Sequence, residues 1–96
     1  MKIIKLLPKT GAFAENKDLA REIRIKDITP ALEKNEDVTL DFKGVDSATQ
    51  SFVHALISEL IRSFGNEILE NIYFKNCNKN VQNIINIVVE YMQAAI

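Results

Sequence analysis

Residues 38–52 read VTLDFKGVDSATQSF, and the predicted architecture depends on them more than on any other segment. Val38, Leu40 and Phe42 alternate with polar residues, which is the period-two pattern of a strand with one buried face. A turn is expected at Lys43-Gly44, because glycine adopts backbone angles that strain other residues. The small polar residues that follow lead into an apolar-striped segment, and hydroxyl side chains at such an entrance are typical of a helix N-terminus. The segment therefore predicts a strand, a tight loop and a helix.

Two further strands are expected, one near each end of the chain. The first covers residues 3–7 and is ended by Pro8, which has no N–H to continue a ladder. A loop at residues 9–11 follows it. The other strand covers residues 72–75 and leads into an asparagine-rich loop at residues 76–80.

The helices between these strands differ in clarity. Residues 52–64 repeat apolar side chains at three- and four-residue spacing, which predicts a helix that ends at Gly65. The last helix is expected to begin at an asparagine cap, Asn78 or Asn80, and to run to about Ala94.

The helical region at residues 16–34 is less regular, because its apolar phase shifts between Arg24 and Ile28. We favour one helical region with a disturbance there. The alternative is two short helices, the second of which begins at Thr29-Pro30.

The order strand-helix, repeated three times, indicates a single α/β domain over residues 1–96 with a mainly parallel sheet and right-handed crossovers. A parallel sheet covered on both faces has continuously apolar strands, whereas this central strand alternates. We therefore expect helices mostly on one face, with Leu40 buried beneath them and Thr39 on the opposite, more accessible face.

The run LDFKGVDSATQSF resembles the signature of bacterial STAS-like domains of unknown function, which are relatives of the anti-sigma-factor antagonists. In those antagonists an equivalent loop carries an Asp-Ser-Ser-Gly run, and a partner kinase phosphorylates its first serine. Aligned without gaps, that serine falls on Gln50, which has no hydroxyl. The resemblance therefore implies a STAS-like fold, and a phosphate would have to be carried by Thr49 or Ser51.

Composition excludes several classes of function. The net charge of −1 argues against a nucleic-acid surface, and we interpret Arg21, Arg24 and Lys26 as part of a solvated face. One cysteine, Cys77, and one histidine, His54, are too few for an internal disulfide or a structural zinc site. The apolar N-terminal run is too short for a signal peptide or a membrane span. We expect a cytoplasmic protein without membrane contact, metal or cofactor.

The candidate site is the loop and helix start at residues 43–54. Thr49 and Ser51 are expected to cap the helix, to accept a phosphate or to dock a partner. Asp41 is expected to brace the loop through backbone N–H groups, and Gly44 to form its turn. The partner-docking candidates as a whole are Asp46, Ser47, Thr49, Gln50 and Ser51.

Three functions fit these features, and none is an enzyme, because catalytic motifs are missing from the sequence. The first is a regulatory protein-interaction module, for which the resemblance implies a histidine-kinase-type ATP-binding protein as partner. The second is a small-ligand or nucleotide-binding domain that holds a phosphate with the same loop. The third is a self-associating element. Ile87, Tyr91 and Ala95 widen the apolar stripe of the last helix to roughly 200°, whereas one sheet face needs a little over about 100°, so these residues are the candidates for a homodimer contact.

Overall fold

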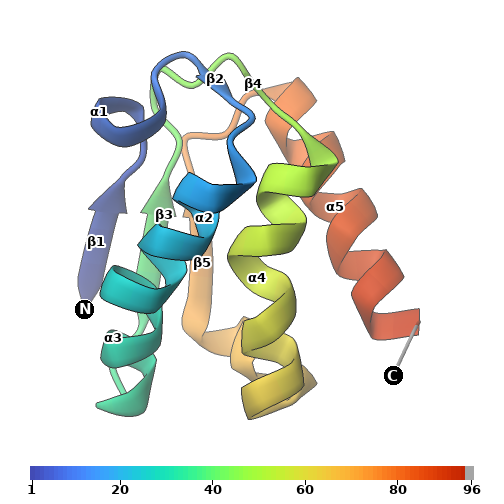
Figure 1. Cartoon of the computed structure of the whole chain (residues 1–96). Coiled ribbons are helices and arrows are strands. Elements are labelled where there is room, and N and C mark those ends of the chain that lie inside the picture. Colours follow the sequence, from blue (N-terminus) through green and yellow to red (C-terminus); the bar gives the residue numbers. More distant parts are fainter. Residues whose placement is uncertain (95–96) are drawn as a thin grey trace.

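The computed structural model describes residues 1–94, and its central feature is a three-stranded parallel sheet in the order β1-β3-β5 (Figure 1). The strands are β1 (Lys2–Lys5), β3 (Val38–Asp41) and β5 (Ile72–Lys75). In the register of the sheet, Leu40 of the middle strand lies between Ile4 and Phe74 of its neighbours. The predicted α/β class and the parallel sheet are therefore confirmed.

The helices lie on one side of this sheet (Figure 1). α2 (Lys17–Ile23) packs against α4 (Gln50–Phe64), and α5 (Lys79–Ala94) packs against the other flank of α4. Helix α4 is thus the middle helix, and its inner face is sealed. Phe52 and Leu56 on this inner face are fully buried, as is Leu40 of the sheet beneath them. Burial of this apolar surface is the main term that holds the layers together.

The opposite face of the sheet is open, but the predicted accessibility of Thr39 is wrong. Ile3 and Tyr73 on that face are exposed by 59% and 43%, whereas Thr39 is exposed by only 2%. Thr39 lies on the middle strand directly between these two residues, and its hydroxyl donates to Met1 Sδ at 3.3 Å. Neighbouring side chains, and not a helix, therefore cover Thr39.

The first helical region is continuous and disturbed where its apolar phase shifts, as predicted. A π-helical turn, η1 (Arg24–Ile28), joins α2 to α3 (Thr29–Glu33), and the Thr29 N–H donates to the Arg24 carbonyl. A π turn bonds residues five apart, one more than an α-helix. Ile23 and Ile28 are five residues apart in the sequence and both are buried. The additional residue in the π turn therefore places Ile28 on the same, core-facing side of the helix as Ile23.

Two local predictions are wrong. The first strand ends at Lys5, and α1 (Leu7–Thr10) replaces the expected loop. Pro8 lies in the first turn of α1, where a missing N–H costs no helical hydrogen bond. The segment predicted as plain loop before α4 contains β4 (Ser47–Ala48), which pairs in parallel with β2 (Phe13–Ala14). Strands of two residues are too short to show a period.

Helix ends follow the sequence closely. Gly65 ends α4 with a φ of 87°, and its N–H donates to the Ile61 carbonyl at 2.8 Å. A 3₁₀ segment, η2 (Asn66–Asn71), then leads into β5. Of the two asparagines predicted to cap α5, Asn78 accepts a hydrogen bond from the Val81 N–H at 2.9 Å.

Candidate functional site

Thr49 caps the helix that begins the candidate site. Its backbone is extended, and its Oγ1 accepts a hydrogen bond from the Phe52 N–H at 3.1 Å. The Thr49 N–H in turn donates to the Ala14 carbonyl at 3.0 Å, which ties the start of α4 to β2. Because the hydroxyl is engaged in the cap, Thr49 is a structural residue in this conformation.

The loop before α4 is held by side chains from the loop after β5. Asp41 Oδ1 accepts hydrogen bonds from Asn76 Nδ2 and from the Lys43 N–H, both at 2.9 Å. Both bonds lower the pKa of the Asp41 carboxyl, because they favour its charged form, and the bond from Asn76 has the larger effect. Asn78 Nδ2 donates to the Asp46 carbonyl at 2.7 Å. The two asparagines therefore fix both ends of the turn.

Gly44 and Ser47 also have packing roles. Gly44 has a φ of 84°, and a Cβ at this position would lie 2.6 Å from Leu7 Cδ2. The Leu7 side chain of α1 thus occupies the space next to residue 44, and it would have to shift if this residue carried a Cβ. Ser47 is half-buried and pairs with Phe13 in the small β2-β4 sheet.

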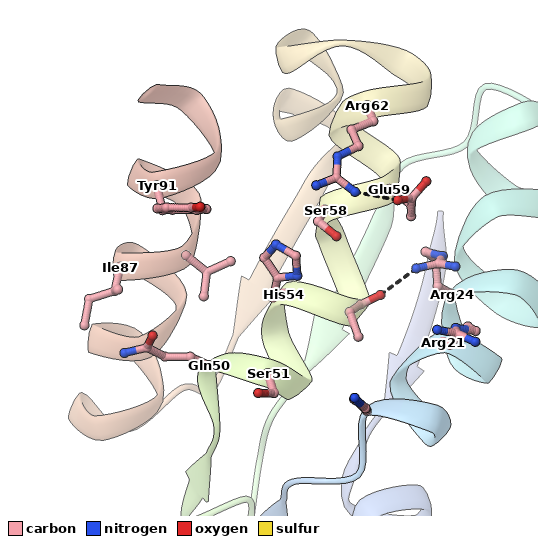
Figure 2. Close-up of a pocket in the computed structure, with 13 residues that line it drawn as sticks. Arg21, Arg24, Gln50, Ser51, His54, Ser58, Glu59, Arg62, Ile87 and Tyr91 are labelled. Carbon is pink, nitrogen blue, oxygen red and sulfur yellow. Dashed lines mark hydrogen bonds and ion pairs between the residues drawn. The ribbon is translucent and has the colours of Figure 1, made fainter. Parts of the chain in front are cut away.

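Gln50 and Ser51 differ from the residues before them, because they are exposed and open onto a groove (Figure 2). The groove has a volume of about 790 Å³, and the outer face of α4 forms its floor between α2 and α5. The floor is polar. Its residues are Gln50, Ser51, His54, Ala55, Ser58, Glu59 and Arg62.

The two walls of the groove differ in character. On the side of α2 and η1 the wall is basic and consists of Lys17, Arg21 and Arg24. On the side of α5 the wall is apolar, and Ile87 and Tyr91 are exposed by 47% and 66%. The structure therefore brings Gln50 and Ser51 together with two of the three residues expected to mediate self-association. Ala95 lies outside the described residues.

Two polar contacts shape the floor. Arg24 reaches across from η1 and donates through Nη1 to the Ala55 carbonyl at 2.8 Å (Figure 2). Arg62 pairs with Glu59 at 2.7 Å, so the only carboxylate among the lining residues is already matched to a cation. Lys17 and Arg21 form no ion pair within residues 1–94. The groove therefore has a net positive charge.

The interpretation of Arg21 and Arg24 as part of a solvated face missed this arrangement. Lys17, Arg21 and Arg24 recur at four- and three-residue spacing, which places them on one helical face. His54 and Ser58 share a four-residue spacing on α4 in the same way. That these two faces meet depends on how α2 packs against α4, and spacing within one helix does not contain this information.

Nucleophilic chemistry is not favoured at Cys77. Burial, and to a lesser extent the charge of Asp41, raise the pKa of its thiol to about 11, so the thiol is protonated near neutral pH. Within residues 1–94, His, Cys, Asp and Glu form no group suited to a metal ion. None of the described helices has the length and apolar character needed to cross a membrane.

Comparison with known families supports the resemblance seen in the sequence. The family model described as "STAS-like domain of unknown function" matches residues 20–82, which is about two thirds of the chain. The matched region contains the whole of α4 and the loop that precedes it. No match was found among curated proteins or among solved structures.

Proposed function

The chain belongs to the family of STAS-like domains of unknown function, and we propose that it is a regulatory, non-catalytic protein-interaction module that binds its partner in the groove over α4. One observation carries this proposal. Exposed polar residues at the start of α4 lie in the same open groove as the exposed apolar side chains of α5. The proposal places this interaction in the cytoplasm.

The apolar wall is the part of the groove that favours a protein as ligand. Ile87 and Tyr91 lie about one helical turn apart and are both exposed, although burial of apolar side chains away from water lowers the free energy. Exposed apolar patches with polar rims are typical of interaction sites, and tyrosine is enriched among residues that dominate binding energy. Tyr91 is therefore the expected centre of the contact.

The basic wall indicates what the partner brings. Lys17 and Arg21 are exposed and unmatched within residues 1–94, so a partner with acidic side chains at this position would gain electrostatic attraction. The resemblance to anti-sigma-factor antagonists suggests a histidine-kinase-type ATP-binding protein as that partner. Its acidic surface would face α2, and its apolar surface would face α5.

Ser51 is the residue of this site that would carry a regulatory phosphate. The Thr49 hydroxyl is engaged in the cap, whereas the exposed Ser51 hydroxyl makes no hydrogen bond within residues 1–94. A phosphate on Ser51 would lie in the first turn of α4, where the helix dipole favours negative charge. It would also offset the charge of Lys17 and Arg21 in the same groove. Phosphorylation is therefore expected to release an acidic partner.

The binding experiment uses a histidine-kinase-type ATP-binding protein, the partner that the proposal names, and measures its affinity for this chain by calorimetry. Tyr91→Ala and Arg21→Glu are each expected to weaken binding by about tenfold or more, as truncation of a central contact residue does. Lys43→Glu is the matched control, because it makes the same charge change on the loop outside the groove. If Lys43→Glu abolishes binding and the two groove variants do not, the partner docks on the loop and the proposed groove is wrong.

A second experiment tests the phosphate. The two proteins are incubated with ATP, and modified residues are mapped by mass spectrometry in the wild type, Ser51→Ala and Thr49→Ser. The proposal expects modification of Ser51 that is lost in Ser51→Ala. Modification of Thr49 would show that the cap opens, and no modification of either residue would remove phosphate from the proposed mechanism.

The groove could instead hold a phosphate-bearing small molecule, since its basic wall favours any anion. Calorimetry with ATP alone separates the two functions. Saturable binding of the nucleotide that Lys17→Gln and Arg21→Gln weaken, and Tyr91→Ala does not, would favour a ligand-binding domain over a protein-interaction module.

A further inference from the structure

A second groove on the molecule has the opposite charge. It lies where α3 and the residues after it meet the end of α4 and η2, and it has a volume of about 600 Å³. Its lining includes four carboxylates and no cation. The residues are Leu32, Glu33, Asn35, Glu36, Phe64, Glu67, Ile68, Glu70 and Asn71. We call this surface the acidic end, and the groove over α4 the basic groove.

The charges of the two surfaces are not neutralised by ion pairs among the described residues. The ion pairs formed within residues 1–94 join Lys9 to Asp27, Lys26 to Glu22 and Arg62 to Glu59. Of these residues only Arg62 and Glu59 belong to either surface, and they lie together in the basic groove. The overall charge of −1 therefore hides a separation of positive and negative charge between two surfaces.

We propose that the acidic end of one copy of this chain docks in the basic groove of another. The four glutamates of the acidic end would face Lys17, Arg21 and Arg24, so that each copy supplies the charges that the other lacks. Apolar surface is available on both sides of the contact. Phe64 at the acidic end is exposed by 37%, and Ile87 and Tyr91 are the exposed apolar wall of the groove.

The contact is head-to-tail, because the two surfaces lie on different sides of the molecule. The basic groove follows the outer face of α4, whereas the acidic end lies where α3 and α4 finish, at the bottom of Figure 1. A contact between unlike surfaces leaves the basic groove of one copy and the acidic end of the other unoccupied. Further copies can then add, and the assembly grows with concentration.

This inference uses the basic groove but does not rest on the proposed partner. A second copy and an acidic partner would compete for the same residues, so self-association would withhold the groove from the partner. The two proposals fail separately, because self-association is measured with the purified chain alone.

The first test is sedimentation velocity of the wild-type chain over a range up to high micromolar concentration. At about 20 mM salt the weight-average mass is expected to rise steadily with concentration, and at about 500 mM salt this rise is expected to disappear, because salt screens charge pairs at a surface. A mass that stays at one chain under both conditions would overturn the proposal.

The decisive test mixes two variants, each of which has one weakened surface. Lys17→Gln/Arg21→Gln removes two of the three cations of the groove wall and leaves the Arg24 contact to Ala55 intact. Glu67→Gln/Glu70→Gln removes two of the four carboxylates of the acidic end. Each variant alone is expected to remain monomeric at low salt. An equimolar mixture is expected to form a dimer and to grow no further, since only one complementary pair of surfaces remains.

The matched control for charge is Lys2→Gln/Lys5→Gln, which removes two exposed lysines from β1 and lies outside both surfaces. It should associate as the wild type does, and circular dichroism checks that all variants are folded. If Lys17→Gln/Arg21→Gln and Glu67→Gln/Glu70→Gln each still associate when measured alone, the contact lies on another surface. A mixture that remains monomeric while the wild type associates would equally contradict the proposal.

Discussion

The residues on either side of Thr49 differ in what their side chains contact. Before it, Asp41 binds Asn76 and the Lys43 backbone, and Gly44 leaves room for Leu7. After it, Gln50 and Ser51 are exposed and line the basic groove. Polar residues that are neighbours in the sequence thus divide into a part that maintains the loop and a part that lines the basic groove.

This division has a consequence for mutation. Substitutions at Asp41, Gly44 and Thr49 should lower the free energy of unfolding, and substitutions at Gln50 and Ser51 should leave it almost unchanged. An interaction role restricted to the second part would then be visible as lost binding without lost stability.

The largest effect on stability is expected from Gly44→Ala. A non-glycine residue at a φ of 84° is strained, and its Cβ would collide with Leu7 Cδ2. The strained backbone alone costs about 1–3 kcal/mol, and the contact with Leu7 adds to this. Chemical denaturation measures the loss.

Gly65→Ala is the matched control for this prediction, because its φ is 87° but a Cβ there meets no atom of the described residues within 4 Å. Gly44→Ala should be the more destabilising of the two, and Leu7→Ala should reduce the difference. Equal losses for the two alanine variants would show that packing of α1 on the turn is unimportant.

Thr49→Ala is expected to cost less, about 1 kcal/mol, because it removes the cap from α4. Thr49→Ser keeps the oxygen and should retain most of the stability. Thermal unfolding of these two variants and of Ser51→Ala makes the test. If Ser51→Ala loses as much stability as Thr49→Ala, the two hydroxyls share the capping role and the division at Thr49 is wrong.

The sequence predicted the layers of the fold well, because those depend on periodicity within single elements. The apolar repeat from Phe52 to Phe64 and the alternation from Val38 to Phe42 each determine which side faces the core. The shifted phase near Ile28 even located the π-helical turn. The accessibility of Thr39 was misjudged because its burial depends on residues outside its own strand. Ile3 lies on β1, Tyr73 lies on β5, and Met1 precedes β1.

The groove could be predicted only in part. Ser51 and Tyr91 were recognised individually, one from its place at a helix start and the other from the width of an apolar stripe. Their position in one groove, with Arg21 opposite, follows from the packing of α2 and α5 on either side of α4. Contacts of this kind join residues tens of positions apart, and no local pattern encodes them.

Asp41 should make a smaller contribution that depends on pH. Its folded-state pKa is lowered, so its hydrogen bonds stabilise the fold above the ordinary pKa of an aspartate and are lost as pH falls through the lowered value. We expect the stability difference between wild type and Asp41→Asn to be constant near neutrality and to shrink below about pH 4. The carboxylate reaches solvent, so the difference should be small.

An NMR titration of the Asp41 carboxyl tests the cause of this lowered pKa. Asn76→Ala removes the stronger of the two hydrogen-bond donors and should raise the Asp41 pKa toward its ordinary value. If Asn76→Ala leaves the Asp41 pKa unchanged, the lowered pKa is due to the Lys43 N–H and to neighbouring charges.

The smallest effect on stability is expected from Ser51→Asp. This variant is the most direct test of the difference between the residues before Thr49 and those after it. Ser51 is exposed, and the first turn of α4 contains no acidic residue, so a carboxylate there meets the favourable end of the helix dipole. The variant should be as stable as the wild type, or more stable by about 0.3–1 kcal/mol. Binding of an acidic partner should nevertheless fall, because the new charge lies in the groove beside Lys17 and Arg21. Ser51→Asn, which has the same size without the charge, should bind as the wild type does. A Ser51→Asp protein that unfolds more easily than Thr49→Ala would instead mean that Ser51 helps to hold the start of α4, and that the structural part of the stretch extends into the helix.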